Sequence, residues 1–216
     1  MAQAYEATIF YIGVLVPISI IAPISLAFLK YKQLPPELKI ITLCLCCSGL
    51  SNLLSTVSSH LGINNMPLVH LYSVVEFGVI CMFYRKILLN ENIRKYIPVL
   101  FLFFLLICIV NALFFQTIFS YSTYTKPIEA IFVILLSIVY LLQLLEDYDK
   151  VIAHKTELIY INSGFLLYFS GSFVLFTIFN IFVNNKDVAF AILDVHATIL
   201  LLMYTSFTIA LWKFKK

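Results

Sequence analysis

Apolar runs of about twenty residues follow one another along almost the whole chain, and this pattern restricts the fold more than any other feature. A helix rises about 1.5 Å per residue, so roughly 20 apolar residues cross the hydrocarbon of a bilayer, which is about 30 Å thick. Seven spans are predicted, at about 8–29, 38–60, 67–86, 97–117, 127–146, 159–183 and 188–212.

The composition agrees with lipid as the main solvent. The 216 residues are 62% hydrophobic and only 12% charged, with a mean hydropathy of +1.00, whereas soluble domains carry about 25% charged residues. We therefore expect an all-α, polytopic integral membrane protein in which residues 1–216 form a single seven-helix transmembrane domain. The connections are short, and prolines such as Pro67, Pro98 and Pro127 are interpreted as turn formers or helix starters.

The basic residues alternate between the two sides of the predicted bundle. Twelve of the fourteen Lys and Arg residues lie in the first, third and fifth connections and the C-terminal tail, and only Lys126 and Lys186 lie on the other side. Cytoplasmic loops are enriched in Lys and Arg, so we expect the N-terminus outside and the C-terminus in the cytoplasm of a multi-pass protein of the plasma (bacterial inner) membrane. Because these residues are dispersed in short loops, we expect no nucleic-acid partner.

Proline and cysteine fall inside predicted spans, and both have ordinary structural explanations. Pro17 and Pro23 interrupt the first span, where each removes a backbone hydrogen bond and can kink the helix. All five cysteines lie in apolar segments without metal-finger spacing, so we interpret them as small buried hydrophobes.

Ionisable residues inside the third span indicate a functional site. Glu76 lies near its centre and is costly in hydrocarbon unless it faces a protein interior. Tyr72, four residues earlier, shares its helical face, while His70 is about 120° away. Counting residues from the outer ends places five large polar groups roughly 9 to 13 Å deep, which predicts a site open to the outside. The predicted ligand-binding residues are Asn52, Tyr72, Glu76, Asn111, Asp194 and His196.

Helical phase limits how these groups combine. Asp194 and His196 are two residues apart, about 200° around the helix, so they cannot both point at one centre. The most economical pairing joins Glu76 with His196 or Asn52. Such a pair suits a receptor-like or transport protein that binds a lipid or small amphiphilic ligand, because intramembrane ionisable residues commonly mark substrate or proton pathways. A retinal pigment is excluded because the last span has no lysine in its interior.

A second hypothesis is a zinc-dependent, membrane-embedded hydrolase. Three of the four histidines, His60, His70 and His196, lie in the outer half, and imidazole with carboxylate is a plausible zinc set. The arrangement resembles the alkaline ceramidase and receptor-like seven-helix hydrolase superfamily, which implies an N-out lipid amide or ester hydrolase with zinc. Glu76 stands where that superfamily has Asp, but the position four residues after His196 is Leu200 rather than a second histidine.

A third hypothesis is a partner or effector without chemistry of its own. Asn64-Asn65 precedes a span with His70-x-Tyr72-x3-Glu76, and the chain ends near Ala-Leu-Trp-Lys. This pattern is similar to that of seven-helix membrane proteins of bacteria, and the resemblance implies no activity. Under this hypothesis the partners are membrane lipids, further copies of the chain, or a membrane partner protein.

Overall fold

The computed structural model describes residues 2–121, 124–146, 156–182 and 186–214. Within these ranges the secondary structure is helical, and seven helical stretches are long and apolar enough to cross a membrane. These stretches are Glu6–Lys30, Pro36–His60, Met66–Ile87, Glu91–Phe115, Thr125–Glu146, Thr156–Thr177 and Asp187–Lys213. The all-α fold and the number of spans are therefore confirmed, and the orientation of the two ends remains a prediction.

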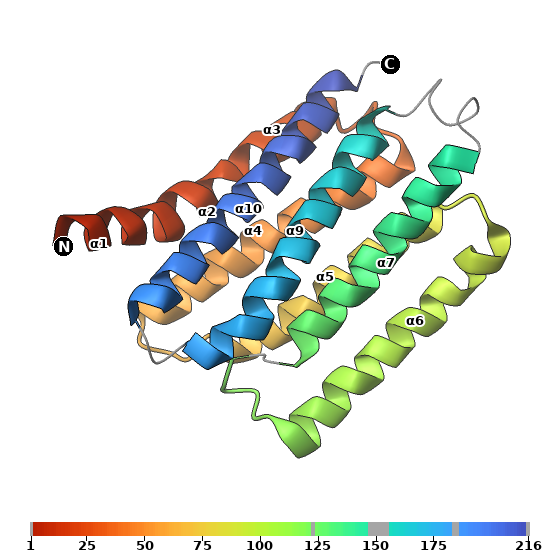
Figure 1. The fold of residues 1–216 in the computed structure, drawn as a ribbon. Helices are drawn as coiled ribbons and strands as arrows, with labels where there is room; N and C mark the ends of the chain where they lie inside the picture. The colour runs from red at the N-terminus through yellow and green to blue at the C-terminus, as the bar shows by residue number, and fades with distance from the viewer. Residues whose placement is uncertain (1, 122–123, 147–155, 183–185, 215–216) are drawn as a thin grey trace.

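The helices run roughly parallel or antiparallel to one another (Figure 1). Their bounds are α1 Ala2–Phe10, η1 Tyr11–Leu15, α2 Val16–Ser19, α3 Ile21–Lys30, α4 Pro36–His60, α5 Met66–Ile87, α6 Glu91–Val110, η2 Asn111–Phe115, α7 Thr125–Glu146, α9 Thr156–Phe182 and α10 Lys186–Lys213. Neighbour contacts close a ring in the order α3, α4, α5, α7, α9, α10 and back to α3, while α6 lies outside it against α5. Ten of the eleven buried polar or charged side chains of the described residues lie on helices of this ring, and the other, Asn111, lies in η2.

The first span is broken in the way its prolines predict. Pro17 lies just after the π-helical turn η1. There the Val16 amide donates to the carbonyl of Tyr11, five residues earlier, whereas an α-helix would use the residue four positions earlier. A second break at Ile20, five residues after the end of η1, separates α2 from α3. A proline ring displaces the carbonyl four residues before it, and these irregular turns accommodate that displacement.

Pro98 does not start its helix, so that prediction is wrong. The helix α6 begins seven residues earlier, at Glu91, because the Asn90 side chain accepts hydrogen bonds from the amides of Asn92 and Ile93. An Asn at this position satisfies backbone donors that a helix start leaves free. Pro98 then lies inside α6, where membrane helices tolerate proline.

Two local contacts fix the ends of the bundle. The Lys30 ammonium donates to the carbonyls of Leu211, Trp212 and Phe214 at 2.9 Å each, so the end of the first span caps the end of α10. A cation at a helix C-terminus also favours the helix dipole. At the opposite end α4 ends at His60, and Gly62, two residues later, has a φ of 69°, in the left-handed region that favours glycine.

The large exposed apolar side chains indicate which solvent surrounds the bundle. They occur on every span, with Leu102 and Phe103 of the peripheral helix α6 as examples. The fully buried side chains are instead aromatic and aliphatic groups of the ring interior, including Phe77, Phe83 and Phe207. A bundle with apolar groups on both its inner and outer surfaces is typical of a multi-pass membrane protein.

Candidate functional site

Glu76 lies inside the ring, on α5, and is only 6% exposed. Its carboxylate accepts a hydrogen bond from the Tyr72 hydroxyl at 2.9 Å, which confirms that these two residues share one helical face. The Tyr72 hydroxyl also hydrogen-bonds the Ser48 hydroxyl of α4 at 2.5 Å. The hydroxyl groups of Ser48 and Tyr72 therefore form a hydrogen-bonded chain from α4 to the Glu76 carboxylate on α5.

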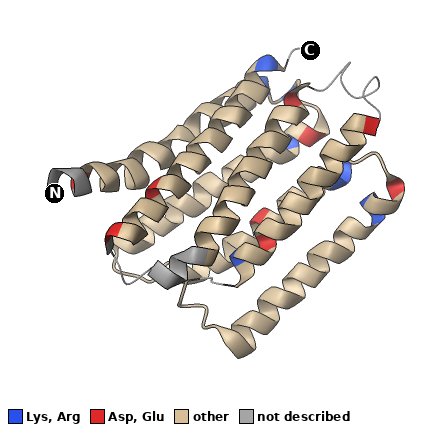
Figure 2. Ribbon diagram, viewed as in Figure 1, with Lys and Arg blue, Asp and Glu red and all other residues tan. Residues whose placement is uncertain are grey.

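The charged partner of Glu76 is Lys126, in the first turn of α7. The Lys126 ammonium lies 3.0 Å from the Glu76 carboxylate and 3.0 Å from the Glu129 carboxylate. Glu129 is fully buried and also accepts from the Ser73 hydroxyl at 2.5 Å. We call Glu76, Lys126 and Glu129 the acidic triad. Figure 2 shows one blue segment near a pair of red segments in the half of the bundle away from the C-terminus.

The acidic triad carries more negative than positive charge. Two carboxylates face a single ammonium, and among the described residues no other cation forms an ion pair with either of them. The Oε1 atom of Glu129 is buried and has no hydrogen-bond partner. Burying an uncompensated charge costs free energy, so the site favours a proton or a cationic group beside Glu129.

Side chains of α9 and α10 complete the surroundings of the triad. Tyr168 and Tyr204 lie within electrostatic range of Glu76, and Asn52 of α4 lies within hydrogen-bonding reach of the Tyr204 hydroxyl. The His196 ring packs on Tyr168, with ring centroids 5.6 Å apart. Its Nε2 atom is buried without a hydrogen-bond partner. Two tyrosines and one imidazole therefore lie near Glu76.

Two connections at the predicted outer end contact each other, and one of them lies near Lys126. The Asn64 amide donates to the Phe119 carbonyl at 2.8 Å, which joins the α4–α5 connection to the segment before α7. Tyr121 lies in that segment and packs on Phe176. Burial raises the pKa of Tyr121 to about 12, although nearby Lys126 acts in the opposite direction. Its hydroxyl therefore stays protonated and neutral at pH 7, within electrostatic range of Lys126.

The predicted pairing of Glu76 with His196 is not found. Glu76 instead pairs with Lys126, and among the described residues no hydrogen bond or ion pair joins Glu76 to His196 or to Asn52. His196 is nevertheless close enough to be affected electrostatically by both Glu76 and Lys126. From the sequence alone, Lys126 is expected in an outer connection. Its position three residues before Glu129, directly at a proline that starts a helix, was the signal that could have identified it.

Among the described residues, neither Asp194 nor Asn111 forms a hydrogen bond or ion pair with the acidic triad. The Thr8 hydroxyl of α1 donates to the Asp194 carboxylate at 3.3 Å, so Asp194 faces the first span while His196 faces α9. This confirms that the two residues point in different directions. Asn111 is buried where α6 passes into the π-helical turn η2, on the peripheral span. Neither residue is brought to Glu76 by a hydrogen bond within the described part of the chain.

The three histidines of the zinc hypothesis do not converge. His60 is exposed, and its Nδ1 contacts the Thr56 carbonyl of its own helix at 2.8 Å. His70 contacts the Ser120 carbonyl at 3.0 Å, and His196 packs among aromatic rings of α9. Across the residues that the structure describes, no group of three or more His, Cys, Asp or Glu side chains could hold a metal ion. The predicted zinc ligands thus belong to three separate environments.

A second buried polar cluster lies in the other half of the bundle. The Tyr84 hydroxyl hydrogen-bonds Ser137 at 2.7 Å and donates to the Asn162 side chain at 2.8 Å. All three side chains are buried, and none is charged. Because each hydroxyl and amide has a partner, this cluster joins α5, α7 and α9 and needs no ligand.

Comparison with protein-family models, curated proteins and solved structures finds no match for this chain.

Proposed function

We propose that this chain is a multi-pass membrane protein with a receptor-like or transport role, which binds a small amphiphilic ligand at the acidic triad. The ligand carries a cationic or proton-donating head group. The observation behind the proposal is the excess carboxylate: Glu129 is fully buried, one of its oxygens has no partner, and Lys126 is shared with Glu76. An ammonium head group beside Glu129 would bring two positive charges to two negative charges.

An apolar groove beside the triad supports an amphiphile rather than a simple cation. A cavity of about 150 Å³ lies between α4 and α5. Its wall includes Leu50, Leu54, Leu68 and Leu71, and Tyr72 lines it too. Tyr72 is also the residue that donates to Glu76. A short alkyl chain in this groove would place its head group at the hydroxyl chain that leads to the carboxylates.

The two other functions considered make different demands. A zinc-dependent hydrolase needs a convergent ligand set, whereas His60, His70 and His196 have separate partners. A partner or effector that acts by self-assembly would need no internal site. That hypothesis therefore gives the buried charge of Glu129 no role. Size measurement of the protein in nanodiscs tests such assembly independently of ligand binding.

Three six-carbon probes test the proposed ligand chemistry. Hexylamine is protonated at pH 7, hexanol is neutral, and hexanoate is an anion of similar length. We expect hexylamine to raise the melting temperature of the purified protein in nanodiscs, and hexanol and hexanoate to have little effect. Glu129→Gln should remove the response, because glutamine keeps the shape of the side chain and lacks its charge. Glu91→Gln is the matched control, since Glu91 is exposed and pairs only with Arg94 among the described residues.

Equal stabilisation by all three probes would refute the proposal, because it would show binding through the alkyl chain alone. A hexylamine response that survives in Glu129→Gln would refute it too. A stable Glu129→Gln protein that has lost the response to hexylamine and kept its oligomeric size supports it.

A further inference from the structure

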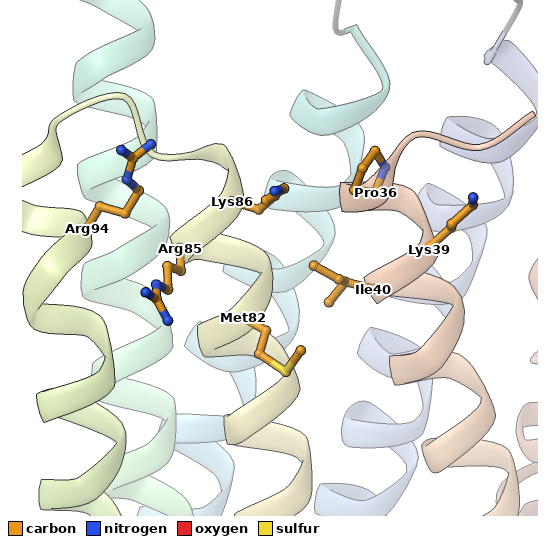
Figure 3. Close-up of a pocket in the computed structure, with 7 residues that line it drawn as sticks. All are labelled: Pro36, Lys39, Ile40, Met82, Arg85, Lys86 and Arg94. Atoms are coloured by element: carbon orange, nitrogen blue, oxygen red, sulfur yellow. The ribbon is translucent and has the colours of Figure 1, made fainter.

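A basic cavity lies at the other end of the bundle, remote from the acidic triad. Its volume is about 760 Å³, and it lies where α4 begins, α5 ends and α6 begins. Figure 3 shows four basic side chains around it, with Ile40 level with Arg85 and Met82 below them. The basic residues are Lys39, Arg85, Lys86 and Arg94.

The positive charge of this cavity is only partly neutralised. Arg94 pairs with Glu91 at 3.0 Å, and the Lys39 ammonium lies 5.5 Å from the centre of the Tyr31 ring. Neither Arg85 nor Lys86 forms an ion pair with any acidic residue that the structure describes. Two arginines and two lysines around one cavity suit a phosphate group, because guanidinium groups bind phosphate oxygens in pairs.

An apolar groove continues from the basic cavity. This second cavity, of about 400 Å³, lies between α5 and α6 and shares Met82 and Arg85 with the first. Its wall is almost wholly apolar and reaches back along α5 as far as Val74. Val74 and Arg85 are eleven residues apart, which corresponds to about 16 Å along a helix. The groove therefore leads from the basic end toward the middle of the membrane.

We propose that the two cavities together bind an anionic glycerophospholipid, with its phosphate among the four basic side chains and one acyl chain between α5 and α6. The enrichment of basic residues at the predicted cytoplasmic side explains why they lie at this end of the bundle. It does not explain why the basic cavity opens into an apolar groove long enough for part of an acyl chain. Basic pockets between membrane helices commonly bind anionic head groups on the cytoplasmic side.

The test compares three probes on the full-length protein in a neutral detergent. They are phosphatidylglycerol, phosphatidylcholine with the same acyl chains, and glycerol phosphate, which has no acyl chain. Native mass spectrometry counts retained lipid, and thermal shift reports affinity. We expect selective retention of phosphatidylglycerol. Arg85→Gln and Lys86→Gln should each weaken its binding about fivefold, because a basic residue near an anionic lipid contributes about that factor.

Two further variants separate the phosphate site from the acyl-chain groove. Val74→Phe narrows the groove without changing charge, so it should weaken phosphatidylglycerol binding while the lipid-free melting temperature stays near that of the wild type. Lys95→Gln removes an exposed charge of α6 that does not line the cavity, and it should leave binding unchanged. Equal retention of phosphatidylcholine, binding of glycerol phosphate as tight as that of the lipid, or an equal loss in Lys95→Gln would each overturn the proposal.

Discussion

Replacement of Lys126 by glutamine should lower the free energy of unfolding by about 3 to 5 kcal/mol. The Lys126 ammonium lies 3.0 Å from each of two carboxylates. At that separation and an effective dielectric constant of about 20, each contact contributes about 5.5 kcal/mol of Coulomb energy, which desolvation of the three ions largely offsets. Without the ammonium, the desolvation cost of Glu76 and Glu129 remains while the attraction is lost. The variant is destabilised for that reason.

A double-mutant cycle measures this attraction directly. The variants are Lys126→Gln, Glu129→Gln and the combination of the two, and the measured quantity is the unfolding free energy in detergent micelles. We expect the double variant to be more stable than the sum of the single changes predicts, by about 0.5 to 3 kcal/mol, because both residues act through one contact. Lys95→Gln is the control, and its effect should stay within about 0.5 kcal/mol because Lys95 is exposed.

Additivity of the two single changes would refute this reasoning. Changes at independent sites add within about 0.3 to 0.5 kcal/mol. A coupling energy inside that margin would mean that the Lys126 side chain extends to the outer membrane surface and does not reach the carboxylates. A Lys126→Gln variant as stable as the wild type would lead to the same conclusion.

Three other predictions concern the fold. A reporter fused after Lys216 should be cytoplasmic, and periplasmic activity would overturn the orientation derived from the basic residues. Gly164→Ala should lower the free energy of unfolding by about 1 to 3 kcal/mol in a thermal assay, because the added Cβ would lie 2.9 Å from the buried Phe207 ring. Gly13→Ala is the control, since a Cβ at Gly13 would meet no neighbouring side chain within 4 Å. Tyr84→Phe should cost about 1 to 3 kcal/mol by the same assay, because it leaves two buried polar partners without their hydroxyl, and an unchanged melting temperature would contradict the network.

The spans could be predicted from the sequence because the length of an apolar run determines them directly. The predicted third span, 67–86, differs by one residue at each end from α5, Met66–Ile87. The fourth span was placed too late, since its prediction began at residue 97 and α6 begins at Glu91. The first turns of α6 are polar and extend beyond the apolar run, so hydropathy does not report them. The side chain of Asn90 marks this helix start instead, because it accepts hydrogen bonds from the first free amides of α6.

The site could be predicted only in part, because depth along a helix axis does not describe how far a side chain reaches. Glu76 and Tyr72 were placed together by helical phase, and the structure agrees. Lys126 lies at the start of α7, yet its flexible side chain carries the ammonium inward to Glu76. A long lysine side chain can place its charge away from its own backbone level. No count of residues from the end of a span includes that reach, so residue depth predicts His196 or Asn52 as the partner of Glu76 instead.

The separation of the two polar clusters on α5 bears on whether the proposed ligand is bound or carried across. Glu76 and Tyr84 are eight residues apart, about 12 Å along the helix. Between them the buried positions of α5 include Phe77, Ile80 and Phe83, each at most 1% exposed. A receptor-like protein needs no polar path through this apolar layer, whereas a carrier must move these side chains to pass a cationic head group. Hexylamine flux into liposomes that depends on Glu129 would therefore show that α5 rearranges, and saturable binding without flux would favour the receptor-like role.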